Sequence, residues 1–179
     1  EAMQRLIEQG KIRAAGVCNY SAAQMEEAER NLPLISNQVP YSMLYREIEK
    51  EIVPYALKHN NSIIAYSPLQ RGLLTGKIKP GQRFNEGDTR GGNIFYTDEN
   101  IKRVNDFLNR LKPLADSKGA TPGQLVIRWT IEQPGITVAL VGARNRKQAV
   151  ENAGANDIRL SKKEMEFINL ELGKLKLAK

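Results

Sequence analysis

Short apolar segments alternate with helical patterns along most of this chain, and that alternation restricts the fold more than any other feature. The apolar segments lie at residues 11–17, 34–39, 62–66 and 136–142. Each connection is long enough for a helical crossover, which neighbouring parallel strands require. The first three segments recur at intervals of about 23 to 27 residues, which suits a barrel of βα units. We therefore expect an α/β protein with about four parallel strands and crossover helices.

Half of a barrel is the architecture that this count predicts. A complete βα barrel takes eight strands and roughly 250 residues, whereas the chain has 179 residues. Its first residues, "EAMQRLIEQGK", have helical periodicity without a preceding cap, as expected for part of a longer chain. A half barrel has two open strand edges and an uncovered apolar inner face. We expect it to associate, either with the missing half or with itself.

Capping residues mark most of the expected helix starts. Ser21 with Gln24, and Ser161 with Glu164, have the spacing of capping boxes. Other helices are expected to begin at Asp98, Thr121 and Asn145. Residues 45–60 are expected to form one helix, restricted or kinked at Pro54, with Ile48, Ile52, Val53 and Leu57 on one stripe.

Composition excludes several classes of protein. The chain is 41% hydrophobic and 26% charged, and no apolar run approaches the roughly 18 residues of a membrane span. The single cysteine, Cys18, excludes an internal disulfide and a CxxC metal site, and no segment resembles a secretion signal, which favours the cytoplasm. The net charge of +7 favours anionic partners, but the basic residues lack the aromatic interleaving of nucleic-acid surfaces.

Polar side chains follow three of the predicted strands. Asn19, Gln38, Tyr66 and Ser67 would lie together at the carboxyl edge of a parallel sheet. Amides and a tyrosine ring form a suitable platform for a planar, amide-bearing ring. Farther along the chain, Arg144 stands beside a helix start, where free N–H groups favour phosphate. The glycine-punctuated residues 69–77 could lay backbone amides along a diphosphate, although they contain no GxGxxG or Walker pattern.

Five motifs carry a family resemblance. They are "EQGKIRAAGVCNYS", "NQVPYSMLYRE", "IIAYSPLQRGLLTGK", "GDTR" and "VGARNRKQAVENAGA". In this order and spacing the chain resembles the aldo-keto reductases, in particular bacterial members related to potassium-channel β subunits. The resemblance covers essentially the whole chain and implies that residues 1–179 are one partial domain, the C-terminal half of a (β/α)8 barrel.

The resemblance implies a dinucleotide site and a role for each matching residue. Tyr66 would stack on the nicotinamide ring, and Asn19 and Gln38 would bind its carboxamide. Cys18 stands where serine is usual, which replaces a strong hydroxyl partner by a weak one. Ser67, Leu69, Arg71 and Gly72 resemble the diphosphate side, and Arg144, Gln148, Glu151 and Asn152 resemble the adenosine end.

The resemblance also implies the cofactor and the reaction. Many members carry arginine where Gln148 stands, but Arg144 could pair with a 2′-phosphate, which favours NADP(H) over NAD(H). The family transfers hydride between the nicotinamide and a small carbonyl or alcohol substrate. Its catalytic tyrosine, lysine, aspartate and histidine lie in the first half of the barrel, so no catalytic residue is assigned here and the chain is expected to be inactive alone.

His59 is expected at a helix end, away from the site. The alternative is a non-catalytic nucleotide-sensing or subunit-interaction module.

Overall fold

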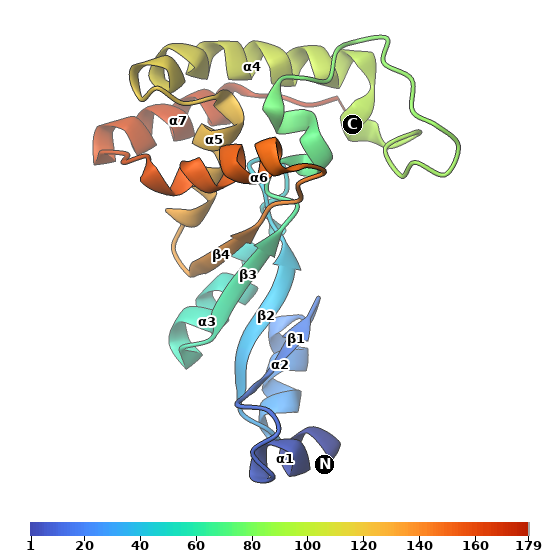
Figure 1. Cartoon of the computed structure of the whole chain (residues 1–179), viewed down its shortest axis with the longest axis vertical. Helices are drawn as coiled ribbons and strands as arrows, with labels where there is room; N and C mark the ends of the chain where they lie inside the picture. The colour runs from blue at the N-terminus through green and yellow to red at the C-terminus, as the bar shows by residue number, and fades with distance from the viewer. Residues whose placement is uncertain (179) are drawn as a thin grey trace. The chain divides into compact units, whose positions relative to one another are not determined.

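The structure is a computed structural model that describes residues 1–178 (Figure 1). Backbone contacts divide the chain into two compact units. The first comprises Glu1–Pro68 with Thr130–Leu140, and the second comprises Leu69–Trp129 with the described residues from Val141 onward. The first unit holds every strand of the sheet, and the second is built from helices and loops.

A parallel four-stranded sheet forms the centre of the first unit. Its strands are β1 (Ala15–Cys18), β2 (Leu34–Pro40), β3 (Ser62–Tyr66) and β4 (Ile136–Leu140), in the spatial order β1-β2-β3-β4. Every neighbouring pair is parallel, which confirms the predicted sheet. The helices of this unit are α1 (Ala2–Glu8), α2 (Ala22–Glu29) and α3 (Ile52–His59), with a 3-10 turn, η1, at Glu47–Glu49.

Burial alternates along the strands, so the two faces of the sheet differ. Val39, Ile63 and Ala65 are at most 1% exposed. On the other face Ile64 and Tyr66 are half-buried, and Val138 and Leu140 are both 42% exposed. Side chains alternate between the faces of a strand, so one face forms the core and the other is open.

The second unit is built around two long helices. They are α4 (Asp98–Ser117) and α7 (Lys162–Lys174), joined by an ion pair of 2.6 Å between Arg110 and Glu171. The remaining elements are α5 (Pro122–Ile131), which extends past the boundary of the unit, α6 (Arg146–Ala153), and the 3-10 segments η2 (Gln70–Thr75), η3 (Ile94–Tyr96) and η4 (Gly154–Asp157). Trp129 is fully buried and its Nε1–H donates to Asn169 Oδ1 at 2.8 Å.

The predicted helix over 45–60 is wrong in two respects. It is divided into η1 and α3, and Leu57 is 54% exposed rather than part of a buried stripe. Pro54 explains the division, because its ring would clash with the carbonyl of the residue four positions earlier if one helix ran through. Proline is tolerated in a first turn, and α3 begins at Ile52.

Two predicted element starts are also shifted. Residues 11–14 do not join β1, because the N–H groups of Lys11 and Ile12 donate to Leu6 at the end of α1 and cannot enter a strand ladder. The cap of α4 is Thr97, whose Oγ1 accepts from Asn100 N–H at 3.3 Å. Asp98 instead accepts from Gly81 N–H at 2.6 Å, so its side chain holds the preceding loop.

Membrane-spanning helices and metal-binding clusters of side chains are both absent from the described residues. Within residues 1–178, no helix is both long and apolar enough to cross a bilayer. The same residues contain no cluster of three or more histidine, cysteine, aspartate or glutamate side chains placed to hold a metal ion.

Candidate functional site

Asn19 and Tyr66 meet at the carboxyl edge of the sheet. Asn19 follows β1 with a left-handed φ of 59°, and its N–H donates to Gln38 O at 2.9 Å. Tyr66 ends β3, and its O–H donates to Asn19 Oδ1 at 3.1 Å. The structure therefore brings together two of the residues that the sequence predicted at this edge.

Gln38 and Cys18 lie side by side on neighbouring strands. They are register partners of β2 and β1; Gln38 is half-buried and Cys18 is exposed. Gln38 is also in register with Ile64, on the open face of the sheet. Its amide is thus available at the same edge, next to a thiol that is only a weak hydrogen-bonding group.

A cavity of about 590 Å³ adjoins this edge within the first unit. Asn19 and Tyr66 line it together with Tyr20, Pro40, Tyr45 and Ile52. That volume lies within the range of ligand pockets, which are roughly 300 to 1,000 Å³. The lining combines tyrosine rings, two amides and apolar side chains with the charged residues Glu47, Lys50 and Glu51.

The chain turns sharply after β3. Ser67, at the end of the first unit, has a φ of 57°. In the second unit, Gln70, Arg71 and Gly72 have φ values of 45°, 46° and 95°. The N–H of Gly72 donates to Leu69 O at 3.0 Å, as does that of Leu74 at 3.1 Å, so these two bonds close the turn.

Side chains within the second unit hold η2 and the loop after it together. Arg71 Nη1 donates to Thr89 Oγ1, and Tyr96 O–H donates to Gln70 O at 2.8 Å. Arg90 hydrogen bonds, and more weakly the charge of Arg144, lower the pKa of Asp88 to about 2. Asp88 is therefore ionised at neutral pH and offsets the charge of Arg90. Within the described residues, Arg71 forms no ion pair.

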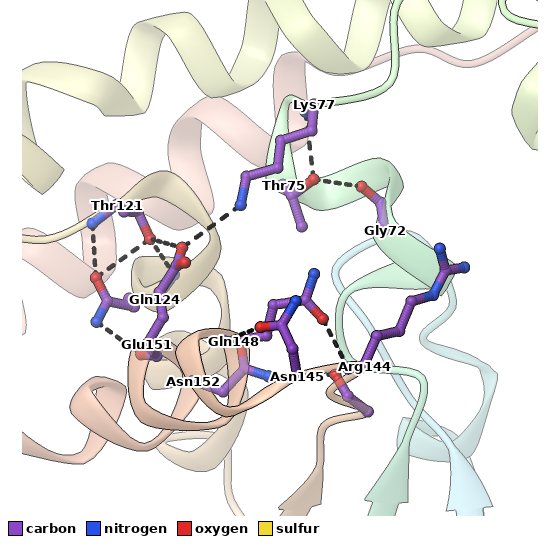
Figure 2. Close-up of polar contacts among 11 residues, drawn as sticks. Gly72, Thr75, Lys77, Thr121, Gln124, Arg144, Asn145, Gln148, Glu151 and Asn152 are labelled. Carbon is purple, nitrogen blue, oxygen red and sulfur yellow. Dashed lines mark hydrogen bonds and ion pairs between the residues drawn. The ribbon is translucent and has the colours of Figure 1, made fainter.

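The start of α6 is organised by its own polar side chains (Figure 2). Asn145 is the cap, and its Oδ1 accepts from Gln148 N–H at 2.9 Å. Gln148 Oε1 in turn accepts from Arg144 N–H at 2.7 Å, and Asn152 Nδ2 donates to Gly142 O at 3.2 Å. The amides of Gln148 and Asn152 thus fix the backbone that precedes the helix.

Arg144 supplies an accessible positive charge at this helix end. It is exposed, and Figure 2 shows its side chain extending away from α6 and Gln148. Among the described residues its guanidinium forms no ion pair. The first turn of α6 contains no acidic residue, so the helix dipole and Arg144 act together to favour an anion.

Glu151 is the centre of a cluster that the sequence did not predict. Lys77 Nζ lies 3.7 Å from its Oε1, Thr121 Oγ1 donates to that oxygen at 3.5 Å, and Gln124 Nε2 donates to its backbone O at 2.7 Å (Figure 2). The only sequence signal for this cluster was the place of Lys77 at the end of the motif "GLLTGK". Thr121 and Gln124 were identifiable only as a helix start.

The first unit is a parallel α/β sheet with helices. Comparison with known proteins identifies the family of the chain. The model of the Aldo/keto reductase family matches residues 1–170. The chain belongs to this family, as its motifs predicted.

Individual relatives show how much of the family architecture is represented. The chain is 36% identical over 163 residues to the NADP(+) aldo-keto reductase yakc of Schizosaccharomyces pombe, covering 89% of this chain and 48% of yakc. It is 33% identical over 159 residues to the NADH-specific methylglyoxal reductase of Escherichia coli, covering 89% and 48%. The glycerol dehydrogenase structure from Gluconobacter oxydans matches with a TM-score of 0.89 and 33% identity, over 97% of this chain and 53% of that one.

These matches confirm the predicted fold class, a partial βα barrel. They also show that the chain spans about half the length of the curated relatives it matches.

Proposed function

We propose that this chain is the cofactor-binding half of an NADP(H)-dependent aldo-keto reductase. The observation that carries the proposal is the contact between Tyr66 and Asn19 at the carboxyl edge of the sheet. An amide held against a tyrosine at this edge matches the chemistry of a nicotinamide, which has a flat ring and a carboxamide. When bound, the nicotinamide supplies the hydride that interconverts a carbonyl and an alcohol.

The first unit would bind the nicotinamide end. Tyr66 would offer a ring face for stacking, while Asn19 and Gln38 would orient the carboxamide through their amide groups. The existing bond from Tyr66 O–H to Asn19 Oδ1 leaves the Asn19 Nδ2 donors for a ligand. Cys18 would contribute little, because a thiol is a weak donor and acceptor.

The second unit would bind the remainder of the dinucleotide. Leu69 and Arg71 would contact the diphosphate through backbone N–H groups and one guanidinium, while Gly72, whose N–H donates to Leu69 O at 3.0 Å, would shape the loop. Ser67 would contribute from the first unit. Asn152 and Glu151 would lie at the adenosine end. Gln148 already accepts from Arg144 N–H, so we assign the 2′-phosphate to the Arg144 guanidinium.

The remaining half of the barrel would supply the proton-transfer groups and part of the substrate pocket. It would be part of the same polypeptide or a separate chain. We propose a small carbonyl compound as substrate and expect no turnover from these 179 residues alone.

Intact mass, combined with a fluorescence titration by NADPH, tests the proposal. A chain of 20.1 kDa should bind NADPH without reducing carbonyl compounds, and Tyr66→Ala should weaken binding by about 10-fold through lost stacking. Tyr55→Ala is the matched control, because Tyr55 lies in α3 and contacts Glu29.

Two results would contradict the proposal. Absence of NADPH binding by the wild-type chain would reject a cofactor role. Binding that persists without turnover after the complementary half is supplied would favour a nucleotide-sensing module instead.

A further inference from the structure

The main chain of Tyr66 is held by the residue that follows β2. Pro40 is the register partner of Tyr66, and proline has no N–H to donate. The next residue, Tyr41, donates its backbone N–H to Tyr66 O at 3.1 Å. Directly after Tyr66 the chain turns at Ser67, with a φ of 57°. The Tyr41 N–H therefore forms the final hydrogen bond between β2 and the end of β3.

Tyr41 is itself fixed by a charged network. Its side chain is buried, at 1% exposure, and its O–H donates to Glu49 Oε1 at 2.5 Å. Arg46 donates through Nε and Nη2 to both Glu49 oxygens, at 2.7 and 2.9 Å. Burial, followed by the Glu49 carboxylate, raises the pKa of Tyr41, so its phenol remains a hydrogen-bond donor.

The residues between Tyr41 and Arg46 form a closed turn. Ser42 and Tyr45 each donate a backbone N–H to the carbonyl of the other at 3.1 Å. Ser42 is fully buried, and its Oγ accepts from Leu44 N–H at 3.2 Å and from Tyr45 N–H at 3.1 Å. This connection is therefore braced from the strand end to the Glu49 carboxylate.

We propose that Tyr41, Arg46 and Glu49 are positioning residues that fix Tyr66 for its contact with the nicotinamide. The inference rests on the proposed function, which gives the Tyr66 ring its role. Asn19 holds the hydroxyl end of Tyr66, and Tyr41 holds its main chain. A tyrosine held at its hydroxyl and at its main chain is already oriented for a flat ligand. Ligand binding then costs less conformational entropy of the Tyr66 side chain.

Tyr41→Phe tests this role while keeping the buried ring. Tyr55→Phe is a matched control, because Tyr55 O–H also donates to a carboxylate, Glu29 Oε2, at 2.6 Å and has no bond to Tyr66. NADPH and 2′-phospho-ADP-ribose, which lacks nicotinamide, are the two ligands to titrate. We expect Tyr41→Phe to weaken NADPH binding by roughly 3- to 10-fold and to leave 2′-phospho-ADP-ribose unchanged. Equal effects on both ligands, or none on NADPH, would overturn the inference.

Hydrogen exchange provides a readout that does not need the cofactor. The amide of residue 41 should exchange faster in Tyr41→Phe than in wild type, and Tyr55→Phe should match wild type there. Unchanged exchange would show that the Glu49 network does not hold the end of β3. A wild-type chain that binds neither ligand would reject the proposed function, while the exchange result would still decide whether the network fixes Tyr66.

Discussion

Individual side chains at the start of α6 have separate roles. Asn145 caps the helix, and Gln148 fixes the Arg144 backbone. The Arg144 guanidinium is exposed and outside any ion pair in the described residues. Under the proposed function, discrimination between NADP(H) and NAD(H) should therefore depend on the Arg144 guanidinium rather than on Gln148, whose Oε1 accepts from the Arg144 N–H.

Arg144→Ala should weaken NADPH binding by about 10-fold and leave NADH binding nearly unchanged, since only NADPH carries the 2′-phosphate. Paired titrations with NADPH and NADH measure the ratio of the two dissociation constants in each variant. Arg146→Ala, two residues away on the same helix start, controls for general loss of positive charge. An equal loss for both nucleotides in Arg144→Ala would place the guanidinium on the diphosphate instead.

At the scale of elements, two helices begin with the same capping pattern but with different chemistry. Ser21 pairs with neutral Gln24 in α2, and Ser161 pairs with Glu164 in α7. Hydrogen bonds from Lys118 and from the Ser161 N–H lower the pKa of Glu164 from 4.5 to about 2. The stabilisation by Glu164 is therefore present above pH 4.5 and is lost as pH falls through about 2.

Glu164→Gln should reduce the loss of stability between pH 5 and about pH 2, because the replacement cannot be protonated. Urea unfolding across that range measures the free energy of unfolding. Ser21→Ala should cost about 1 kcal/mol with little dependence on pH, since its box contains no titrating side chain. If the free energy of unfolding of Glu164→Gln fell with pH as steeply as that of the wild type, the acid sensitivity would belong to other carboxylates.

For the whole molecule, the open face of the sheet decides whether the chain associates. Val138 and Leu140 are exposed on the face that carries Tyr66, although both are apolar residues of a strand. An apolar face with open strand edges favours association. The separate 179-residue chain should therefore not remain a monomer unless the complementary half covers this face.

Sedimentation velocity should give a mass above 20.1 kDa for the wild-type chain. The double variant Val138→Ser and Leu140→Ser should sediment closer to a monomer, since the apolar side chains that drive contact are removed. Leu170→Ser is the control, because Leu170 is 61% exposed on α7 in the second unit. A wild-type monomer at high concentration would contradict the expected association.

The sequence by itself determined the parallel strands, most helix boundaries and the family. These features depend on local signals: the alternation of apolar segments, capping residues such as Asn145 and Ser161, and motifs read in order. The same signals placed Asn19 and Tyr66 at the ends of strands. His59 lies in the last turn of α3, as its position predicted.

Only the tertiary structure decided which polar groups pair with one another. Thr97 rather than Asp98 caps α4, because Asp98 binds the distant Gly81 N–H. The cluster of Lys77 with Glu151, and the network that joins Tyr41 to Glu49 and to the Tyr66 carbonyl, likewise depend on contacts across separate segments. Such pairings have no local periodicity, because folding sets the distances between residues that are far apart in the chain.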